Sequence, residues 1–175
     1  MRCSLLVSGA VLLAVVVPAS ASAATTRYEV EASPATCTGT IDSNWSGFSG
    51  SGFCNGTNAT GAYAQFTATA SAAGTATLEV RFANGTSSSR PADLIVNGTT
   101  VQAVSFESTG AWNTWVTKSL PVTVNAGSNT IRLNPTTSGG LPNIDGVGQR
   151  QHRQRRARLL VRRRHFGVPE QRLLP

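Results

Sequence analysis

Short runs of alternating apolar and polar residues fill the middle of the chain. One run lies at 61–72 and the next at 75–85, and each contains a stretch in which every second residue is apolar. The apolar positions are Ala64, Phe66, Ala68 and Ala70 in the first run, and Ala76, Leu78, Val80 and Phe82 in the second. A period of two is typical of a half-buried antiparallel strand. The pattern therefore predicts two such strands, joined by a tight turn at Ala73-Gly74.

Turn signals separate further short strands. The dipeptide Asn97-Gly98 follows the apolar run 94–96 and is a strong hairpin signal. Two more short strands flank a turn at 125–127. Strands this short, with turns this frequent, predict an all-β sandwich of antiparallel strands. Neither a helix of useful length nor a sequence repeat is expected before Gly148.

The first 23 residues have the features of a secretory signal peptide. One basic residue, Arg2, precedes an apolar run at 5–17, and the segment closes on the small-x-small cleavage site Ala21-Ser22-Ala23. The alternative is a retained membrane anchor, but the apolar run is short against the ~20 residues that a spanning helix needs. We therefore expect a signal peptide at 1–23, secretion to the extracellular space, and no membrane partner after cleavage.

Export determines how the cysteines are interpreted. Cys3 leaves with the signal peptide, so the mature chain retains Cys37 and Cys54. In an oxidising compartment an even pair most simply forms one disulfide. A metal-thiolate site would need further ligands, and neither histidine lies before Arg150. The sequence predicts a disulfide between Cys37 and Cys54.

The positive charge of the protein is confined to its last segment. The formal net charge is +7, with a pI near 10.7. Residues 1–149 carry six basic and seven acidic side chains, whereas 150–175 carry nine arginines and a single acid, Glu170. A charge block this local describes a segment and not the whole domain. The high pI is therefore no argument about what the central region does.

The segment 149–175 differs in composition from everything upstream. It contains no serine or threonine, and arginine is its commonest residue. It fits a disordered tail, a linker, or an out-of-frame GC-rich coding sequence. The functional alternative is a basic tail that binds nucleic acid or anionic surfaces, because arginine clusters attract phosphate. Since the segment lacks interleaved aromatics beyond Phe166 and belongs to an exported chain, we expect no nucleic-acid partner.

The region 24–149 lacks the residues that an independent enzyme requires. It contains no histidine, which excludes Ser-His-Asp and Cys-His arrangements there. A glycosidase needs two carboxylates across a cleft, whereas Glu29 and Glu31 are two residues apart and would share one face of a strand. We therefore expect no enzyme. A small polysaccharide hydrolase fragment is the alternative that turnover would reveal.

The same acid pair suits a hard cation. Calcium takes about six to eight oxygen ligands, typically carboxylates and backbone carbonyls. Glu29 and Glu31 lie near the start of the domain and Asp145 near its end. The first and last strands of a sandwich often lie side by side, so a cation there would join the two ends. The alternative is three solvated surface acids.

Two tryptophans point to a sugar ligand. Trp112 and Trp115 are three residues apart, so in an extended strand they would face opposite sides and one could be exposed. An exposed indole offers a flat apolar face to the C–H face of a pyranose, while neighbouring amides meet the hydroxyls. The alternative is that both indoles are packed inside the domain.

Seven sequence blocks, taken in order, resemble the carbohydrate-binding modules of family 35, which are close relatives of family 6. The blocks are RYEVEA from Arg27, GFSGSGFCN from Gly47, VRFANG from Val80, LIVNG from Leu94, TGAWNTW from Thr109, LPVTVNAGSNTIRL from Leu120 and LPNID from Leu141. They cover roughly 27–147, nearly the whole mature domain. The resemblance implies a jelly-roll β-sandwich at 24–148 that binds polysaccharide or oligosaccharide as a monomer and performs no chemistry.

The resemblance also implies roles for particular residues. A structural calcium would be held by Glu29, Glu31 and Asp145. The sugar site maps onto Trp112 as the stacking platform and Asn143 as the hydrogen-bonding amide, with Arg90 and Asn84 as further candidates. Family members are usually attached to plant-cell-wall hydrolases. We therefore expect a module that targets such an enzyme to plant-type polysaccharide, with the choice between uronate, galactose, mannan or another sugar left open.

The chain departs from the family pattern after Gly148. In the family the strand that carries the last aspartate continues for several alternating residues, whereas here Val147-Gly148 gives way at once to Gln149-Arg150. A truncated strand would lose inward side chains worth roughly 1.5–3 kcal/mol each. We therefore place the end of the sandwich at Gly148, and a last strand truncated there would leave the domain poorly stable.

Overall fold

The structure is a computed structural model that describes residues 24–152. The predicted signal peptide and the arginine-rich residues from 153 onward lie outside the described residues. The described chain forms strands and no helix. The strands are β1 (Thr26–Glu29), β2 (Thr36–Cys37), β3 (Gly39–Asp42), β4 (Phe53–Gly56), β5 (Ala64–Ala70), β6 (Gly74–Ala83), β7 (Arg90–Val96), β8 (Thr99–Phe106), β9 (Val116–Val124), β10 (Gly127–Pro135) and β11 (Asn143–Gln151).

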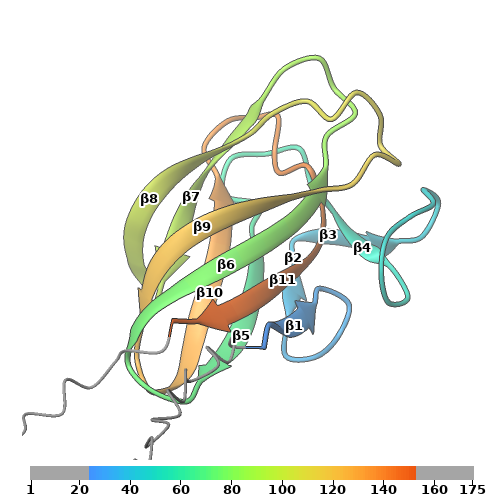
Figure 1. Ribbon diagram of the computed structural model, residues 1–175. Helices are drawn as coiled ribbons and strands as arrows, with labels where there is room; N and C mark the ends of the chain where they lie inside the picture. Colours follow the sequence, from blue (N-terminus) through green and yellow to red (C-terminus); the bar gives the residue numbers. More distant parts are fainter. Residues whose placement is uncertain (1–23, 153–175) are drawn as a thin grey trace, which may run out of the picture.

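The strands form two antiparallel sheets packed face to face (Figure 1). The six-stranded sheet has the order β3-β4-β11-β6-β9, with β1 also paired to β11, and the five-stranded sheet has the order β2-β5-β10-β7-β8. This arrangement confirms the predicted antiparallel β-sandwich. Within residues 24–152 the chain holds no helix of the length and apolarity that a membrane crossing needs.

The core lies between the two sheets, where the alternating residues predicted it. All eight apolar side chains of the two alternating runs are at most 2% exposed. Phe66 and Phe106 are fully buried among them and belong to the five-stranded sheet. At roughly 1.5–3 kcal/mol for each large apolar side chain, this layer is the main source of stability.

The predicted hairpin at Asn97-Gly98 is confirmed. Both residues have positive φ, +51° and +82°, and they join β7 to β8. Left-handed backbone at both central positions matches the twist of the flanking strands, which is why Asn-Gly is favoured there. The Asn97 amide also donates to Asn129 Oδ1 at 2.8 Å, so the hairpin is tied to β10.

The last strand runs past the end that the composition predicts. β11 continues through Gln149 and Arg150 to Gln151, paired throughout with β6. The prediction of an end at Gly148 was wrong because strand pairing uses backbone groups, which polar residues supply as well as apolar ones. The Gln151 amide further holds the β5–β6 turn, since it accepts from Ser71 and donates to Ala72 O at 2.7 Å.

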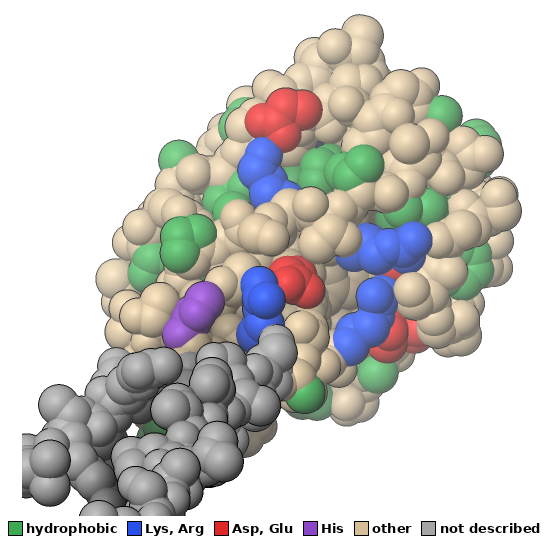
Figure 2. Space-filling model, in the orientation of Figure 1, with side chains coloured by type: hydrophobic (Ala, Val, Ile, Leu, Met, Phe, Trp, Pro, Cys, Tyr) green, Lys and Arg blue, Asp and Glu red, His purple; other side chains and the backbone are tan. Residues whose placement is uncertain are grey.

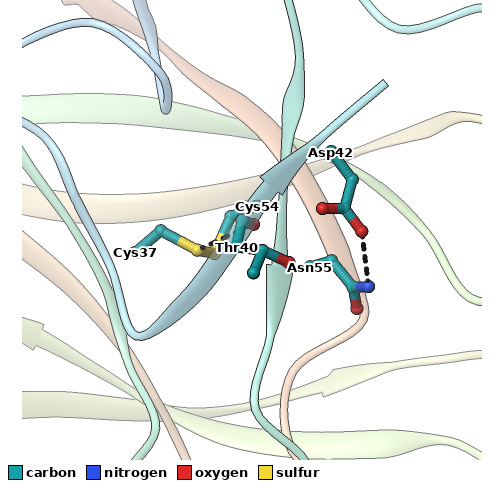
Figure 3. Close-up of a disulfide and its surroundings, with 5 residues drawn as sticks. All are labelled: Cys37, Thr40, Asp42, Cys54 and Asn55. Atoms are coloured by element: carbon teal, nitrogen blue, oxygen red, sulfur yellow. Dashed lines mark hydrogen bonds between the residues drawn. A yellow bond between two sulfur atoms is a disulfide. The ribbon is translucent and has the colours of Figure 1, made fainter. Parts of the chain in front are cut away.

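The predicted disulfide between Cys37 and Cys54 is present (Figure 3). Cys37 ends β2 in the five-stranded sheet and Cys54 lies in β4 of the six-stranded sheet, so the bond joins the two layers. Beside it, the Asn55 amide donates to Asp42 Oδ2 at 2.8 Å across the β3–β4 pair. The sequence separation of 17 residues makes the chain-entropy contribution of this bond about 3 kcal/mol.

Candidate functional site

Three loops that carry or adjoin the predicted sugar-binding residues meet at one end of the sandwich. They are 84–89 between β6 and β7, 107–115 between β8 and β9, and 136–142 between β10 and β11 (Figure 1). The register explains the meeting, because Phe82 near the end of β6 pairs with Val116 at the start of β9. On the other side, Ala83 pairs with Asn143 at the start of β11.

Trp112 lies in the 107–115 loop, four residues before β9 begins. Its indole packs directly against the backbone of Gly85, where an added Cβ would come within 2.6 Å of the ring. Only glycine at position 85 allows this contact. Trp112 and Trp115 are both half-buried, which lies between the two alternatives of one exposed indole and two packed ones. Both residues precede β9, so strand alternation does not apply to them.

Arg90 places a cation beside this indole. Its guanidinium carbon lies 5.3 Å from the centre of the Trp112 ring. Nη1 donates to Leu141 O at 2.7 Å and to Asn58 Oδ1 at 3.0 Å, which fixes the side chain between two loops. Partial burial lowers the pKa of Arg90 because desolvation disfavours the charged form. An arginine nevertheless stays charged at neutral pH and has further N–H groups to donate.

Asn143 is buried to 4% exposure at the start of β11. Among the described residues its side-chain amide forms no hydrogen bond, and neither amide atom is fully enclosed. A buried amide normally finds a partner within the protein. The Asn143 amide therefore keeps its capacity to donate and accept at the loop end where Trp112 and Arg90 also lie.

Asn84 is occupied by its own loop. It is fully buried, and Nδ2 donates to Ser88 O and Phe106 O, both at 2.9 Å. Oδ1 accepts from the Thr86 backbone at 3.2 Å and from its hydroxyl at 2.6 Å. Four hydrogen bonds leave the amide no free group for a sugar. Asn84 shapes the 84–89 loop in this structure, and we do not carry it into the sugar site.

The two glutamates of the predicted cation site converge on Gly50. Glu29 ends β1, whereas Glu31 lies in the turn beyond it, so the two are not neighbours on one strand as expected. A Cβ at Gly50 would overlap Glu31 Oε1 and lie 3.6 Å from Glu29 Cδ. Glu29 Oε2 and Glu31 Oε2 are both buried without a hydrogen-bond partner. Two buried carboxylate oxygens that lack donors fit a hard cation.

Asp145 does not join the two glutamates around a shared site, because its carboxylate is paired with two arginines. The fully buried carboxylate accepts from Arg27 at 2.8 Å, from Arg81, and from the Ser49 backbone at 3.0 Å. Partial burial opposes the charge on Arg27, but its bonds to Glu29 and Asp145 outweigh that effect and raise its pKa. Consistent with this pairing, residues 24–152 contain no group of three acids, cysteines or histidines placed to hold a metal.

The outer face of the six-stranded sheet carries a few charge pairs. Basic and acidic side chains lie next to one another there (Figure 2). Beside the pairs of Asp145, Lys118 bonds to Glu107 at 2.7 Å, and Arg150 lies 3.6 Å from Glu79. This face therefore shows mixed charge, whereas most of the arginine cluster of the sequence lies outside the described residues.

The 43–52 loop folds over this face, although no binding role was expected for it. Arg81 donates to Gly47 O at 2.7 Å and to Ser49 Oγ at 3.2 Å. The period of two already placed Arg81 on the outward side of β6, so an outward anchor could have been suspected. Trp45 could not, because it lies outside any periodic run; it is 39% exposed.

Known proteins resemble the part of the chain that forms the sandwich. The model of a family described as carbohydrate binding module (family 6) matches residues 28–148. Endo-1,4-beta-xylanase B of Cellvibrio japonicus is 44% identical over 111 residues, which cover 62% of this chain and 18% of the relative. The chain spans about a fifth or less of the length of the curated relatives it matches.

Two solved structures show the same sandwich. A family 35 carbohydrate binding module from an environmental isolate is 32% identical, with a TM-score of 0.70, over 73% of this chain and 93% of that one. The module Xyl-CBM35, solved in complex with a glucuronic acid containing disaccharide, is 36% identical with a TM-score of 0.63. That alignment covers 77% of this chain and 91% of Xyl-CBM35.

Proposed function

The chain belongs to the family 6 carbohydrate-binding modules and is similar to solved modules of the related family 35, and from this premise we propose that residues 24–152 bind a plant-type cell-wall polysaccharide without acting on it. Carbohydrate binding follows from the family. The class of polysaccharide is our proposal, supported by the xylanase in which a similar segment occurs. The loops 84–89, 107–115 and 136–142 contain no histidine, and their one acid, Glu107, is bonded to Lys118.

One arrangement carries the proposal: a half-exposed indole, a cation and a free amide at the same loop end. Trp112 lies flat on Gly85 and is held in place for stacking against a pyranose. Arg90 adds charged N–H donors beside it. Asn143 adds an amide with no protein partner among the described residues. An apolar platform with a few convergent polar groups is the usual composition of a small-ligand site.

The cation beside the platform favours an acidic sugar. Charge-assisted hydrogen bonds from arginine to a carboxylate are about twice as strong as neutral ones. A uronic acid would offer Arg90 such a carboxylate, and a similar module was solved with a glucuronic acid containing disaccharide. We therefore include uronate-bearing xylan as the preferred ligand within the proposal.

Calcium is the second part of the proposal. Glu29 and Glu31 would hold it, because each has a buried oxygen without a donor. Arg27 already pairs with Glu29 Oε1, so the cation would bind the free Glu29 Oε2 and the Glu31 carboxylate. It would tie the start of the domain to the 43–52 loop, since the Ser51 N–H already donates to Glu31 Oε1 at 2.8 Å. The Asp145 carboxylate already has three donors, so Glu29 and Glu31 carry the site.

The module is proposed to be secreted, to act as a monomer and to target an enzyme to its polysaccharide. Support comes from the predicted signal peptide and from relatives in which the matched segment is a small part of a longer enzyme. The rival of a basic tail that binds nucleic acid concerns residues outside the described chain. Deleting residues 153–175 distinguishes the two functions. The shortened chain should still bind sugar, and neither the full nor the shortened chain should show salt-sensitive retention on DNA.

A panel of polysaccharides tests the proposal. Retention of the purified chain is measured by affinity electrophoresis in xylan, glucuronoxylan, galactan and mannan, with and without a calcium chelator. Trp112→Ala should lose retention while its far-UV spectrum stays unchanged. The matched control is Val101→Ala, an exposed apolar residue on β8 that is 46% exposed. Wild-type binding that Trp112→Ala retains in full would refute the site, and turnover of any polysaccharide would refute the non-catalytic part.

A further inference from the structure

We propose that Trp45, in the 43–52 loop, is a second sugar-stacking platform that binds a further pyranose of the polysaccharide held at Trp112. The inference rests on the proposed function and adds a second contact to it. Among the described residues, Trp45 is the only exposed tryptophan, with an exposed fraction of 39%, whereas Trp112 and Trp115 are half-buried. Covering an indole removes several times more apolar area from water than covering a methyl group, so a ligand that stacks on Trp45 gains from the contact.

The 43–52 loop is held rigid although it has no regular secondary structure. Trp115 donates from Nε1 to Ser46 O at 2.9 Å, directly next to Trp45. Arg81 donates to Gly47 O at 2.7 Å. At the base of the loop, Phe53 packs on Trp115 with ring centres 5.3 Å apart. A loop anchored at several points loses little entropy on binding, which favours an effective platform.

The chemistry around Trp45 suits a neutral polar ligand. Ser43, Asn44 and Ser46 are exposed on both sides of it, and the whole loop 43–52 carries no charged residue. Hydroxyl and amide groups around an apolar ring match the hydroxyls and the C–H face of a sugar. A charged protein or nucleic acid would find no complementary charge on this loop. A further unit of the same polysaccharide is therefore the occupant we assign.

The two platforms are close enough for one oligosaccharide. Gly47 packs against the segment after Trp112, because a Cβ there would lie 3.1 Å from Trp115 Cδ1 and 3.7 Å from Asn113 O. Trp45 is two residues from Gly47, a distance of at most about 7 Å along the chain. Asn113 immediately follows Trp112. The loop of the second platform thus adjoins the loop of the first.

Asn143 lies on the same face as this contact. It pairs with Ala83, and residues two apart on a strand share a face, so it points to the side on which Arg81 holds the 43–52 loop. Its burial to 4% on an outer face reflects the loops that cover it. The Asn143 amide therefore lies on the side of the six-stranded sheet on which Arg81 holds the 43–52 loop.

Oligosaccharide length separates the two platforms. Binding is measured by calorimetry with the disaccharide and the hexasaccharide of xylan, glucuronoxylan, galactan and mannan, for wild type, Trp45→Ala, Trp45→Phe, Trp112→Ala and the control Val101→Ala. Trp45→Ala should bind disaccharides as wild type does and hexasaccharides about five- to tenfold more weakly. Trp45→Phe should recover most of the loss, and Trp112→Ala should lose both ligands.

The outcomes distinguish this inference from the proposed function. If wild type binds no member of the panel, the proposed function and this inference fail together. If wild type binds but Trp45→Ala binds the hexasaccharide equally well, only the second platform is refuted. Sedimentation velocity at several concentrations gives a further check: an association of wild type that Trp45→Ala abolishes would assign the indole to contact with another copy of the chain and overturn the proposal.

Discussion

Gln149 is a polar side chain on the core-facing side of the central strand, and replacing it with methionine should stabilise the protein. It lies two residues after Val147 on β11 and pairs with Leu78, and both neighbours are fully buried core residues. Gln149 is 3% exposed, and its Oε1 is buried with no partner among the described residues. Methionine has the same unbranched shape and removes the unpaired oxygen.

The size of the effect follows from this geometry. An unsatisfied buried acceptor costs about 1–3 kcal/mol. The amide nitrogen is not fully enclosed, so part of the gain is offset by its lost hydration. We expect Gln149→Met to raise the free energy of unfolding by about 1–2 kcal/mol, which for a domain of this size raises Tm by roughly 3–10 °C. Affinity for sugar should not change, because Gln149 lies away from the loop end.

Gln151 is the matched control on the same face of the same strand. Its amide accepts from the Ser71 N–H at 2.9 Å and donates to Ala72 O at 2.7 Å. Gln151→Met should therefore lower the free energy of unfolding by about 1 kcal/mol. Urea unfolding followed by near-UV circular dichroism measures both variants under one condition. If Gln149→Met destabilises as Gln151→Met does, the Gln149 amide is satisfied and the reasoning is wrong.

Three further predictions address the disulfide, the loss of stability at acid pH and the cation site. The double variant Cys37→Ser, Cys54→Ser should lose about 3 kcal/mol of stability in chemical unfolding, and a loss below about 1 kcal/mol would show a compact unfolded state. The hydrogen bond from Lys118 lowers the pKa of Glu107 in the folded protein. The stability that this bond contributes is fully present above the ordinary glutamate pKa of 4.5 and is lost as the pH falls through the lowered pKa of the folded state. Because Glu107 is largely exposed, Glu107→Gln should remove less than about 1 kcal/mol of this acid dependence, seen in Tm against pH. Gly50→Ala should abolish the rise of Tm with added calcium, since φ is +66° there and a Cβ would meet Glu31; an unchanged calcium response would remove the cation from this place.

The strands could be predicted because each depends on a local pattern. Alternation in 64–70 and 76–82 is a property of consecutive residues, and both runs form strands with the expected faces buried. The Asn97-Gly98 hairpin is equally local. The end of β11 was missed because its outer residues are stabilised by β6 pairing and by the Gln151 contacts with the β5–β6 turn, and neither is visible in the composition of the segment.

The sequence indicated which residues gather at the candidate site better than it indicated their hydrogen-bond partners. Trp112, Arg90 and Asn143 do gather at one loop end, because the register brings their loops together. Side-chain partners depend on contacts far apart in the sequence. The bond between Arg81 and Asp145 joins residues 64 apart, and no local pattern shows it. The saturation of Asn84 by its own loop is likewise invisible before the loop is folded.

The position of β11 in the sheet has a consequence for the order of events during synthesis. β11 lies between β4 and β6 and also pairs with β1, so three strands made early share a partner that is made after them. Until residue 151 has left the ribosome, these strands keep open edges, which are prone to pair with other chains. The six-stranded layer therefore closes after translation of its central strand, in a single late step that depends on contacts between the two ends of the domain.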